Sequence, residues 1–172
     1  VNSTGLHQDP RLGRTQPERD RAFETHLKAP YDEAVALAVR EAGGWIVNPA
    51  GDGWCCALPE PQEAVLCALV LQHRLRRRLA DTPVGPVLAR VGLHVGSSGT
   101  QPRHYIHDAG NFAARVQERA PPGGVAVTQT VWEHCRRRRV AGVRFRSLGI
   151  KRLKGVGNEE VFAASCTEHE AS

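Results

Sequence analysis

Two short apolar runs rich in Val, Ile and Trp constrain the fold more than any other part of this sequence. They lie within residues 42–58 and flank Gly51-Asp52-Gly53. Asp-Gly between such runs predicts two antiparallel strands joined by a tight turn. Two explanations of Asp52 then stay open. It tolerates the backbone conformation that the turn requires, or it presents a carboxylate, between glycines that allow close approach, to a hard cation.

Length and composition indicate one soluble globular domain. The chain has 172 residues, of which 41% are hydrophobic and 24% charged, enough for one well-buried core. We expect the domain to cover residues 1–165, followed by a polar tail over residues 166–172. No apolar run approaches the roughly 20 residues of a membrane-spanning helix, and the first residues do not resemble a signal peptide, so we predict a cytoplasmic location. The absence of Met, even at position 1, predicts a fragment or a processed piece.

The cysteines and the charge exclude two other classes of protein. None of the five cysteines has the CxxC spacing of a zinc site. The net charge of +5 suits an anionic partner such as a nucleotide. A nucleic-acid-binding domain would rest on the basic runs at residues 74–78 and 136–139, but a helix end and a solvated surface explain both. With 5% aromatic residues, the chain also lacks a stacking platform for single strands.

Helical and strand patterns alternate along the chain, which predicts an α/β or α+β sandwich of helices on a mixed sheet. Residues 1–29 are expected to be mostly loop, with at best a short helix over residues 18–28. Besides the hairpin, strands are expected over residues 87–95, 125–127, 143–148 and 161–164, with residues 151–157 between the last two. Further helices are expected over residues 30–42, 61–79, 108–120 and 129–135.

Three spacings share a possible phosphate chemistry. Asp52 offers a carboxylate at a turn. Asn111 and Arg115 lie four residues apart on one predicted helix, and so project from the same face. Lys154 precedes Gly155-Val156-Gly157, a turn whose backbone amides can approach an anion. A carboxylate, an arginine and a lysine are the parts of a phosphoryl-transfer site, although each residue alone also fits a structural role as a helix-start, surface or loop residue.

Five stretches taken in order resemble the catalytic domain of bacterial class III adenylate and guanylate cyclases. They are Gly51-Asp52-Gly53 and residues 90–96, 111–115, 122–128 and 148–155. The resemblance covers residues 2–162. It implies an α+β, ferredoxin-like and palm-like mixed sheet covered by helices, in a homodimer with active sites in the groove between the subunits. It also implies fusion to other signalling domains.

The resemblance further implies an activity and the residues that perform it. Two Mg²⁺ or Mn²⁺ ions would assist the 3′-hydroxyl of a nucleoside triphosphate in attacking its own α-phosphate, which releases pyrophosphate. Asp52 matches the second metal-binding aspartate of the family. By the same match Asn111 orients the ribose, Arg115 stabilises the transition state from the opposite subunit, and Lys154 grips the terminal phosphates.

The remaining matches concern the phosphate-binding loop, the first metal ligand and the residues that contact the purine. Ser3 and Thr4 resemble the end of the phosphate-binding loop after the first strand. The family's first metal-binding aspartate would fall just before Val1. Asn48 and His104 occupy the two positions that read the purine, where the family usually has lysine and aspartate. Both can hydrogen-bond a purine, and ATP is expected because it is common in the family, with GTP as the alternative.

We therefore predict an adenylate cyclase domain of a larger signalling protein. The rival prediction is a non-catalytic cyclase-like domain that binds nucleotide or a partner and regulates an attached output. The four residues matched to metal, ribose, transition state and phosphate favour the enzyme. The unusual residues at Asn48 and His104, and the first strand missing from the sequence, favour the rival.

Overall fold

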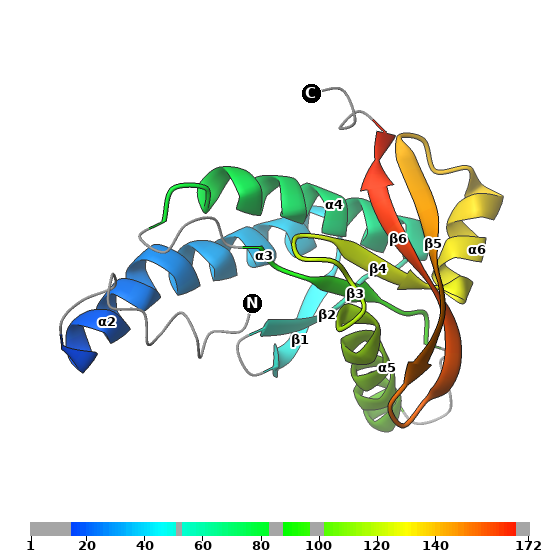
Figure 1. The fold of residues 1–172 in the computed structure, drawn as a ribbon, viewed down its shortest axis with the longest axis horizontal. Helices are drawn as coiled ribbons and strands as arrows, with labels where there is room; N and C mark the ends of the chain where they lie inside the picture. Colours follow the sequence, from blue (N-terminus) through cyan, green and yellow to red (C-terminus); the bar gives the residue numbers. More distant parts are fainter. Residues whose placement is uncertain (1–14, 51–52, 83–87, 97–101, 168–172) are drawn as a thin grey trace. The chain divides into compact units, whose positions relative to one another are not determined.

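The computed structural model describes residues 15–50, 53–82, 88–96 and 102–167 (Figure 1). The chain divides into two compact units. The first is formed by Val1–Leu58 and Val70–Ala89, and the second by Pro59–Leu69 and Arg90–Ser172.

The first unit begins with three consecutive helical segments, α2 (Gln16–Phe23), the π-helix η2 (Glu24–Lys28) and α3 (Ala29–Glu41). These segments confirm the short helix expected over residues 18–28, which starts two residues earlier, and most of the loop expected before it lies outside the described residues. A capping box starts α2, because the Thr15 hydroxyl accepts from Glu18 N and the Glu18 carboxylate accepts from Thr15 N. Helical backbone then continues into Pro30, since proline in the first turn of α3 needs no N–H donor.

The hairpin follows α3 as predicted. Gly43, at φ +69°, ends the helix in a conformation that glycine adopts readily. Strands β1 (Trp45–Ala50) and β2 (Gly53–Ala57) pair antiparallel. Asp52 falls between these two strands in the sequence and lies outside the described residues.

Helix α4 (Pro61–Arg78) confirms the amphipathic helix expected after residue 60, and residues from both units belong to it. The predicted apolar face is buried, namely Val65, Ala68, Leu69, Leu75 and Leu79. Its basic end is more than a solvated surface. Arg74 bridges Glu41 at 2.5 Å and Arg78 bridges Glu33 at 2.6 Å, so two of these arginines pair with α3.

The second unit contains a four-stranded mixed sheet, which confirms the predicted fold class. Its strands are β3 (Val91–Leu93), β4 (Val125–Thr128), β5 (Val143–Leu153) and β6 (Gly157–Cys166), in the order β3-β4-β6-β5. The β3–β4 pair is parallel and the other two pairs are antiparallel.

Two strand lengths differ from the sequence prediction. β3 has three residues instead of nine, because its ladder with β4 extends only from Val91 to Leu93. β5 and β6 are longer than predicted and continue to the pair Leu153↔Gly157, which leaves a turn of residues 154–156. A register shift next to Gly149, which has φ +81°, changes which β5 residues face the core. Because of this shift, the residues of β5 do not show one continuous period-two alternation of apolar and polar side chains in the sequence.

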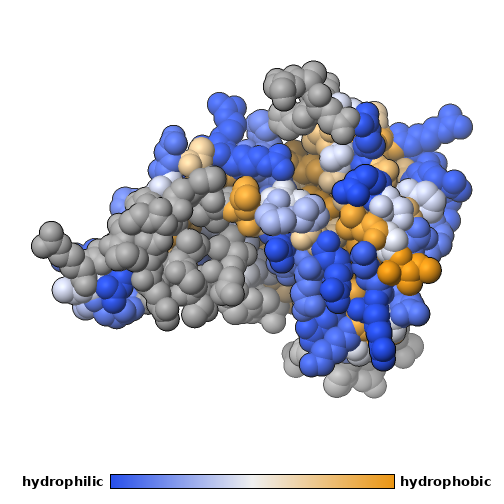
Figure 2. Space-filling view, viewed as in Figure 1, coloured by the Kyte–Doolittle hydropathy of each residue, from blue (hydrophilic) through white to orange (hydrophobic). Residues whose placement is uncertain are grey.

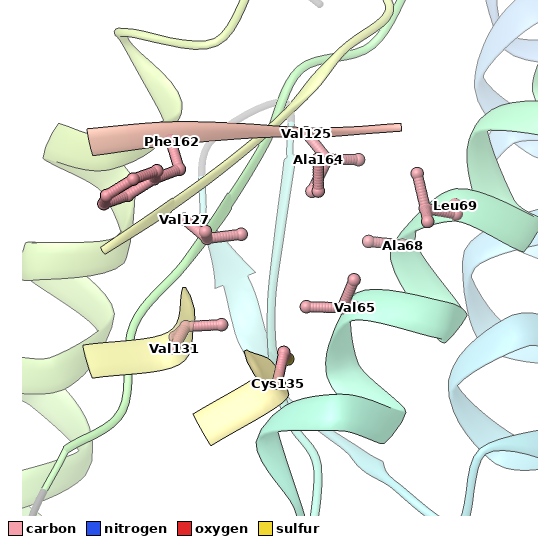
Figure 3. Packing of buried hydrophobic residues seen from close by; sticks show 9 residues of the cluster. All are labelled: Val65, Ala68, Leu69, Val125, Val127, Val131, Cys135, Phe162 and Ala164. Carbon is pink, nitrogen blue, oxygen red and sulfur yellow. The ribbon is translucent and has the colours of Figure 1, made fainter. Parts of the chain in front are cut away.

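Helices cover both faces of this sheet. Side chains alternate along β4, so that Val125 and Val127 face one way and Ala126 the other. On the first face, the start of α4 and helix α6 (Gln129–Arg138) close a core cluster, and Figure 3 shows its side chains pointing toward one another. Its members are Val65, Ala68, Leu69, Val125, Val127, Val131, Cys135, Phe162 and Ala164. On the second face, helix α5 (Pro102–Gln117) contributes Val116 to a smaller cluster with Ala126, Leu153 and Val161.

Both helices of this unit are longer than predicted. α5 begins six residues before the expected start at Asp108, because Pro102 suits the first turn of a helix. α6 extends to Arg138 and ends at Arg139, whose φ is +50°. Thr128 occupies the predicted cap position of α6, but its hydroxyl makes no capping hydrogen bond. Among the described helices, none combines the length and hydropathy needed to cross a bilayer.

Candidate functional site

Helix α5 brings Asn111 and Arg115 onto one face, and the backbone of His104 lies on the same helix. Asn111 and Arg115 stand four residues apart, which places them about 40° from each other around a helix of 3.6 residues per turn. Asn111 is exposed and Arg115 half-exposed. Figure 2 shows a mainly hydrophilic surface over α5. The face is therefore open to a polar ligand.

Arg115 is held by a near neighbour on the helix surface. Its Nη1 lies 2.7 Å from Glu118 Oε1, and the two side chains are 40% and 50% exposed. Ion pairs of this spacing and exposure stabilise a helix by only about 0.2–0.5 kcal/mol. A phosphate with two or more charges can therefore replace Glu118 as the partner of Arg115.

Close packing against β3 fixes the position of α5 in the second unit. Gly92 of β3 faces the helix, and a Cβ added there would lie 2.2 Å from Ala113 O and 2.3 Å from Gln117 N. In addition, Gln117 Nε2 donates to Arg90 O at 2.9 Å. Only glycine permits this approach, so the motif around Gly92 places the helix that carries Asn111 and Arg115.

A stacked ring pair adds to this contact at the end of β3. The rings of His94 and Phe112 are 3.8 Å apart and nearly parallel, at 5°. Burial lowers the pKa of His94, because desolvation disfavours the charged imidazolium. Within the described structure, His94 Nδ1 is buried without a hydrogen-bond partner. Phe112 adjoins Asn111, so the neutral imidazole supports the helix turn from which Asn111 projects.

Lys154 lies in the β5–β6 turn, next to a pocket. The turn contains Gly155 at φ +77°, and β6 begins at Gly157 with φ +115°. The pocket has a volume of about 510 Å³ and is lined by Arg119, Arg152, Leu153, Lys154, Gly155, Val156 and Gly157. Three cationic residues and a glycine-rich turn thus surround one depression. Such a turn lets backbone N–H groups approach an anion.

The hairpin of the first unit is anchored to α3 by contacts that the sequence analysis missed. Trp54 Nε1 donates to Asp32 Oδ1 at 2.7 Å. Asp32 also forms an ion pair with Lys28, whose ammonium lies 5.1 Å from the centre of the Trp54 ring. The i, i+4 spacing of Lys28 and Asp32 was a readable signal. Their partner Trp54, 22 residues away from Asp32, was not.

The predicted site residues are distributed between the two units. Asn111, Arg115, Lys154 and the backbone of His104 belong to the second unit. Asn48 is in β1 of the first unit, opposite Cys55 in the ladder. Ser3, Thr4 and Asp52 lie outside the described residues.

The described residues do not by themselves provide a metal centre. Within the described ranges, no group of three or more His, Cys, Asp or Glu side chains could hold an ion. The prediction of a divalent ion therefore rests on Asp52. All five cysteines are free thiols, and burial raises the pKa of Cys55 and Cys135, which keeps these two in the weakly ligating thiol form.

Comparison with known proteins gives a consistent result. No family model matches the chain. The Rhizobium meliloti protein called "Putative adenylate cyclase 3" is 30% identical over 119 residues, which are 68% of this chain and 20% of that protein. Other curated relatives, which are 28% to 30% identical, are matched over 14% to 46% of their length. This chain therefore spans less than half of each of these relatives.

Two solved structures match nearly the whole chain. The adenylate/guanylate cyclase/hydrolase from Silicibacter pomeroyi is 25% identical, covers 92% of this chain and 90% of its own, and superimposes with a TM-score of 0.60. An adenylyl cyclase of P. aeruginosa is 14% identical, covers 98% and 91%, and gives a TM-score of 0.57, which is a likeness of fold.

The sheet order, the helices on both faces and these superpositions define a nucleotide cyclase fold. The chain belongs to the class III adenylate/guanylate cyclase domains.

Proposed function

We propose that the chain is the catalytic domain of an adenylate cyclase, which converts ATP to cyclic AMP and pyrophosphate. The observation that carries this proposal is the shared face of Asn111 and Arg115 on α5, in a chain with the cyclase fold. In the reaction the 3′-oxygen forms a bond to the α-phosphorus and loses its proton. The bond from the α-phosphorus to the bridging oxygen breaks, and pyrophosphate leaves.

The residues of the second unit provide three parts of this chemistry. The Asn111 amide orients the ribose by donating and accepting hydrogen bonds. The Arg115 guanidinium stabilises charge that develops on the α-phosphate, and its fork of donors suits phosphate oxygens. Lys154 holds the terminal phosphates beside the glycine-rich turn. Because Arg115 acts from the opposite subunit in this proposal, the active form is a homodimer.

Residues elsewhere complete the proposed site. A divalent Mg²⁺ or Mn²⁺ bound by Asp52 would neutralise phosphate charge and lower the pKa of the attacking hydroxyl. Ser3 and Thr4 end the loop that holds phosphate. Asn48 and His104 contact the purine, and their side chains can pair with adenine or with guanine. Further domains of a cytoplasmic signalling protein would control this module.

The test measures cyclic AMP and cyclic GMP formed with Mn²⁺ and either ATP or GTP. Arg115→Ala and Asn111→Ala should each lower turnover by about 100-fold or more, the usual effect of losing one transition-state donor. Arg138→Ala, which removes an exposed arginine at the end of α6, is the matched control and should retain activity. Asp52→Ala should abolish cyclase turnover, and raising the Mn²⁺ concentration should not restore it.

Two other outcomes would redirect the assignment. Production of cyclic GMP in preference to cyclic AMP would identify a guanylate cyclase, with Asn48 and His104 reading guanine. A folded, dimeric form that is extended upstream through the expected first strand and still forms neither product would be a non-catalytic cyclase-like domain. In that case, equilibrium binding of ATP and GTP would decide whether it senses nucleotide.

A further inference from the structure

The pocket beside Lys154 contains an arginine to which neither the motifs nor the comparisons give a role. Arg119 follows the end of α5, in a tight turn where its N–H donates to Val116 O at 2.9 Å. Its guanidinium crosses to the sheet and donates through Nη2 to Arg152 O at 3.1 Å. Arg152 stands two residues before Lys154, so this hydrogen bond ties the end of α5 to the strand that leads into the lysine turn.

The charge in this pocket is not compensated by the protein. In the described part of the chain, no carboxylate forms an ion pair with Arg119, Arg152 or Lys154. Arg115, one helical turn before Arg119, is by contrast paired with Glu118. Three neighbouring cations without an acidic partner raise the local potential and attract an anion with several charges.

The turn itself leaves room for such an anion. A Cβ added to Gly155 or Gly157 would meet nothing within 4 Å, so the backbone of the turn is open on that side. Both glycines have positive φ, a conformation in which successive N–H groups can converge on one point. The pocket therefore combines open backbone with uncompensated side-chain charge.

We propose that Arg119 binds polyphosphate together with Lys154, as a residue additional to those matched by the family motifs. A guanidinium has five N–H donors, and the bond to Arg152 O uses only one of them. That bond fixes the direction of the side chain and lowers the entropy that is lost on binding. The remaining donors form charge-assisted hydrogen bonds to phosphate oxygens.

The ligand is a chain of linked phosphates, either free or as part of a nucleotide. Its identity as the triphosphate of the substrate rests on the proposed function, whereas polyphosphate binding can be measured without turnover. Calorimetric titration of the full chain with tripolyphosphate, without added metal, is the direct test. Parallel titrations with ATP, adenosine and citrate separate phosphate recognition from base recognition and from general attraction of anions.

Arg119→Ala should weaken tripolyphosphate binding about tenfold, the effect of one charge-assisted contact. Arg119→Lys keeps the charge and should recover part of the loss, whereas Arg119→Gln keeps a donor for Arg152 O but should remain weak. Arg146→Ala removes an exposed arginine from β5, the strand that also carries Arg152. This control should change tripolyphosphate binding less than twofold. Because Arg119 is exposed, all of these variants should fold, and circular dichroism checks that they do.

Equal binding by Arg119→Ala and Arg146→Ala would overturn the proposal, as would citrate binding as tight as tripolyphosphate. Cyclase assays of the same proteins keep the two proposals apart. Tripolyphosphate binding that depends on Arg119, in a chain without turnover, supports this inference and contradicts the catalytic one. Cyclase turnover that needs Lys154 but is unchanged in Arg119→Ala supports the catalytic proposal and contradicts the role of Arg119.

Discussion

Arg115 Nη1 and Glu118 Oε1 lie 2.7 Å apart on the exposed surface of α5. This ion pair gives the proposed transition-state arginine a partner in the turn that directly follows its own helix. The pair is exposed and three residues apart, so it holds Arg115 only weakly. We therefore regard Glu118 as a resting partner that the substrate displaces.

Glu118→Gln should raise cyclase activity up to about twofold, because the free energy of the lost ion pair is only about 0.2–0.5 kcal/mol. The free energy of unfolding should fall by no more than the same amount. Turnover at subsaturating ATP and urea unfolding are the measurements. Glu63→Gln, which removes an exposed carboxylate from α4, is the control. A large loss of activity in Glu118→Gln would show that Glu118 takes part in the site.

Gly92→Ala should destabilise the second unit by about 3 kcal/mol or more, because the new methyl would lie 2.2 Å from Ala113 O and cannot be accommodated without moving α5. Gly149→Ala separates this effect from the loss of glycine as such. Gly149 has φ +81° and no atom within 4 Å of an added Cβ, so only backbone strain of about 1–2 kcal/mol applies. Urea unfolding followed by circular dichroism measures both. Similar losses in the two variants would contradict the close-packing explanation.

His94 should make stability depend on pH below about 6.5, its ordinary pKa. Burial lowers the pKa of His94 in the folded chain, so the unfolded chain binds more protons in this window. The free energy of unfolding then falls as pH decreases through the window. His94→Phe keeps an aromatic ring against Phe112 but does not titrate. Unfolding at pH 7.5 and 5.5 should show a smaller decrease for His94→Phe than for the wild type, and parallel decreases would refute this role.

Asp32→Ala should loosen the hairpin by about 1–2 kcal/mol, because the indole N–H of Trp54 loses its acceptor. Asp32→Asn keeps an acceptor and loses only the charge that pairs with Lys28. Its effect should stay below about 1 kcal/mol. Hydrogen exchange of the amides in β1 and β2 reports the change locally. If Asn and Ala at position 32 had equal effects, the ion pair rather than the Trp54 contact would anchor the hairpin.

Local signals in the sequence predicted the elements best where one residue type decides the conformation. Gly43 ended α3 as expected, since few residues other than glycine adopt positive φ easily, and β1 and β2 pair antiparallel as predicted. The apolar spacing of α4 identified its buried face for the same local reason. Predictions failed where a neighbour in space decides, as in the three-residue length of β3 and the extension of β5 and β6 past a register shift.

The sequence by itself determined the family and the common face of Asn111 and Arg115, and it predicted the residues with phosphate chemistry, because motif order and helical spacing are properties of the chain alone. Only the tertiary structure showed the pairing of Arg115 with Glu118, the approach of α5 to Gly92, and the link from Arg119 to the strand before Lys154. The last two join residues 21 or more positions apart. Such contacts depend on how the sheet and its covering helix pack, and no local pattern encodes that packing.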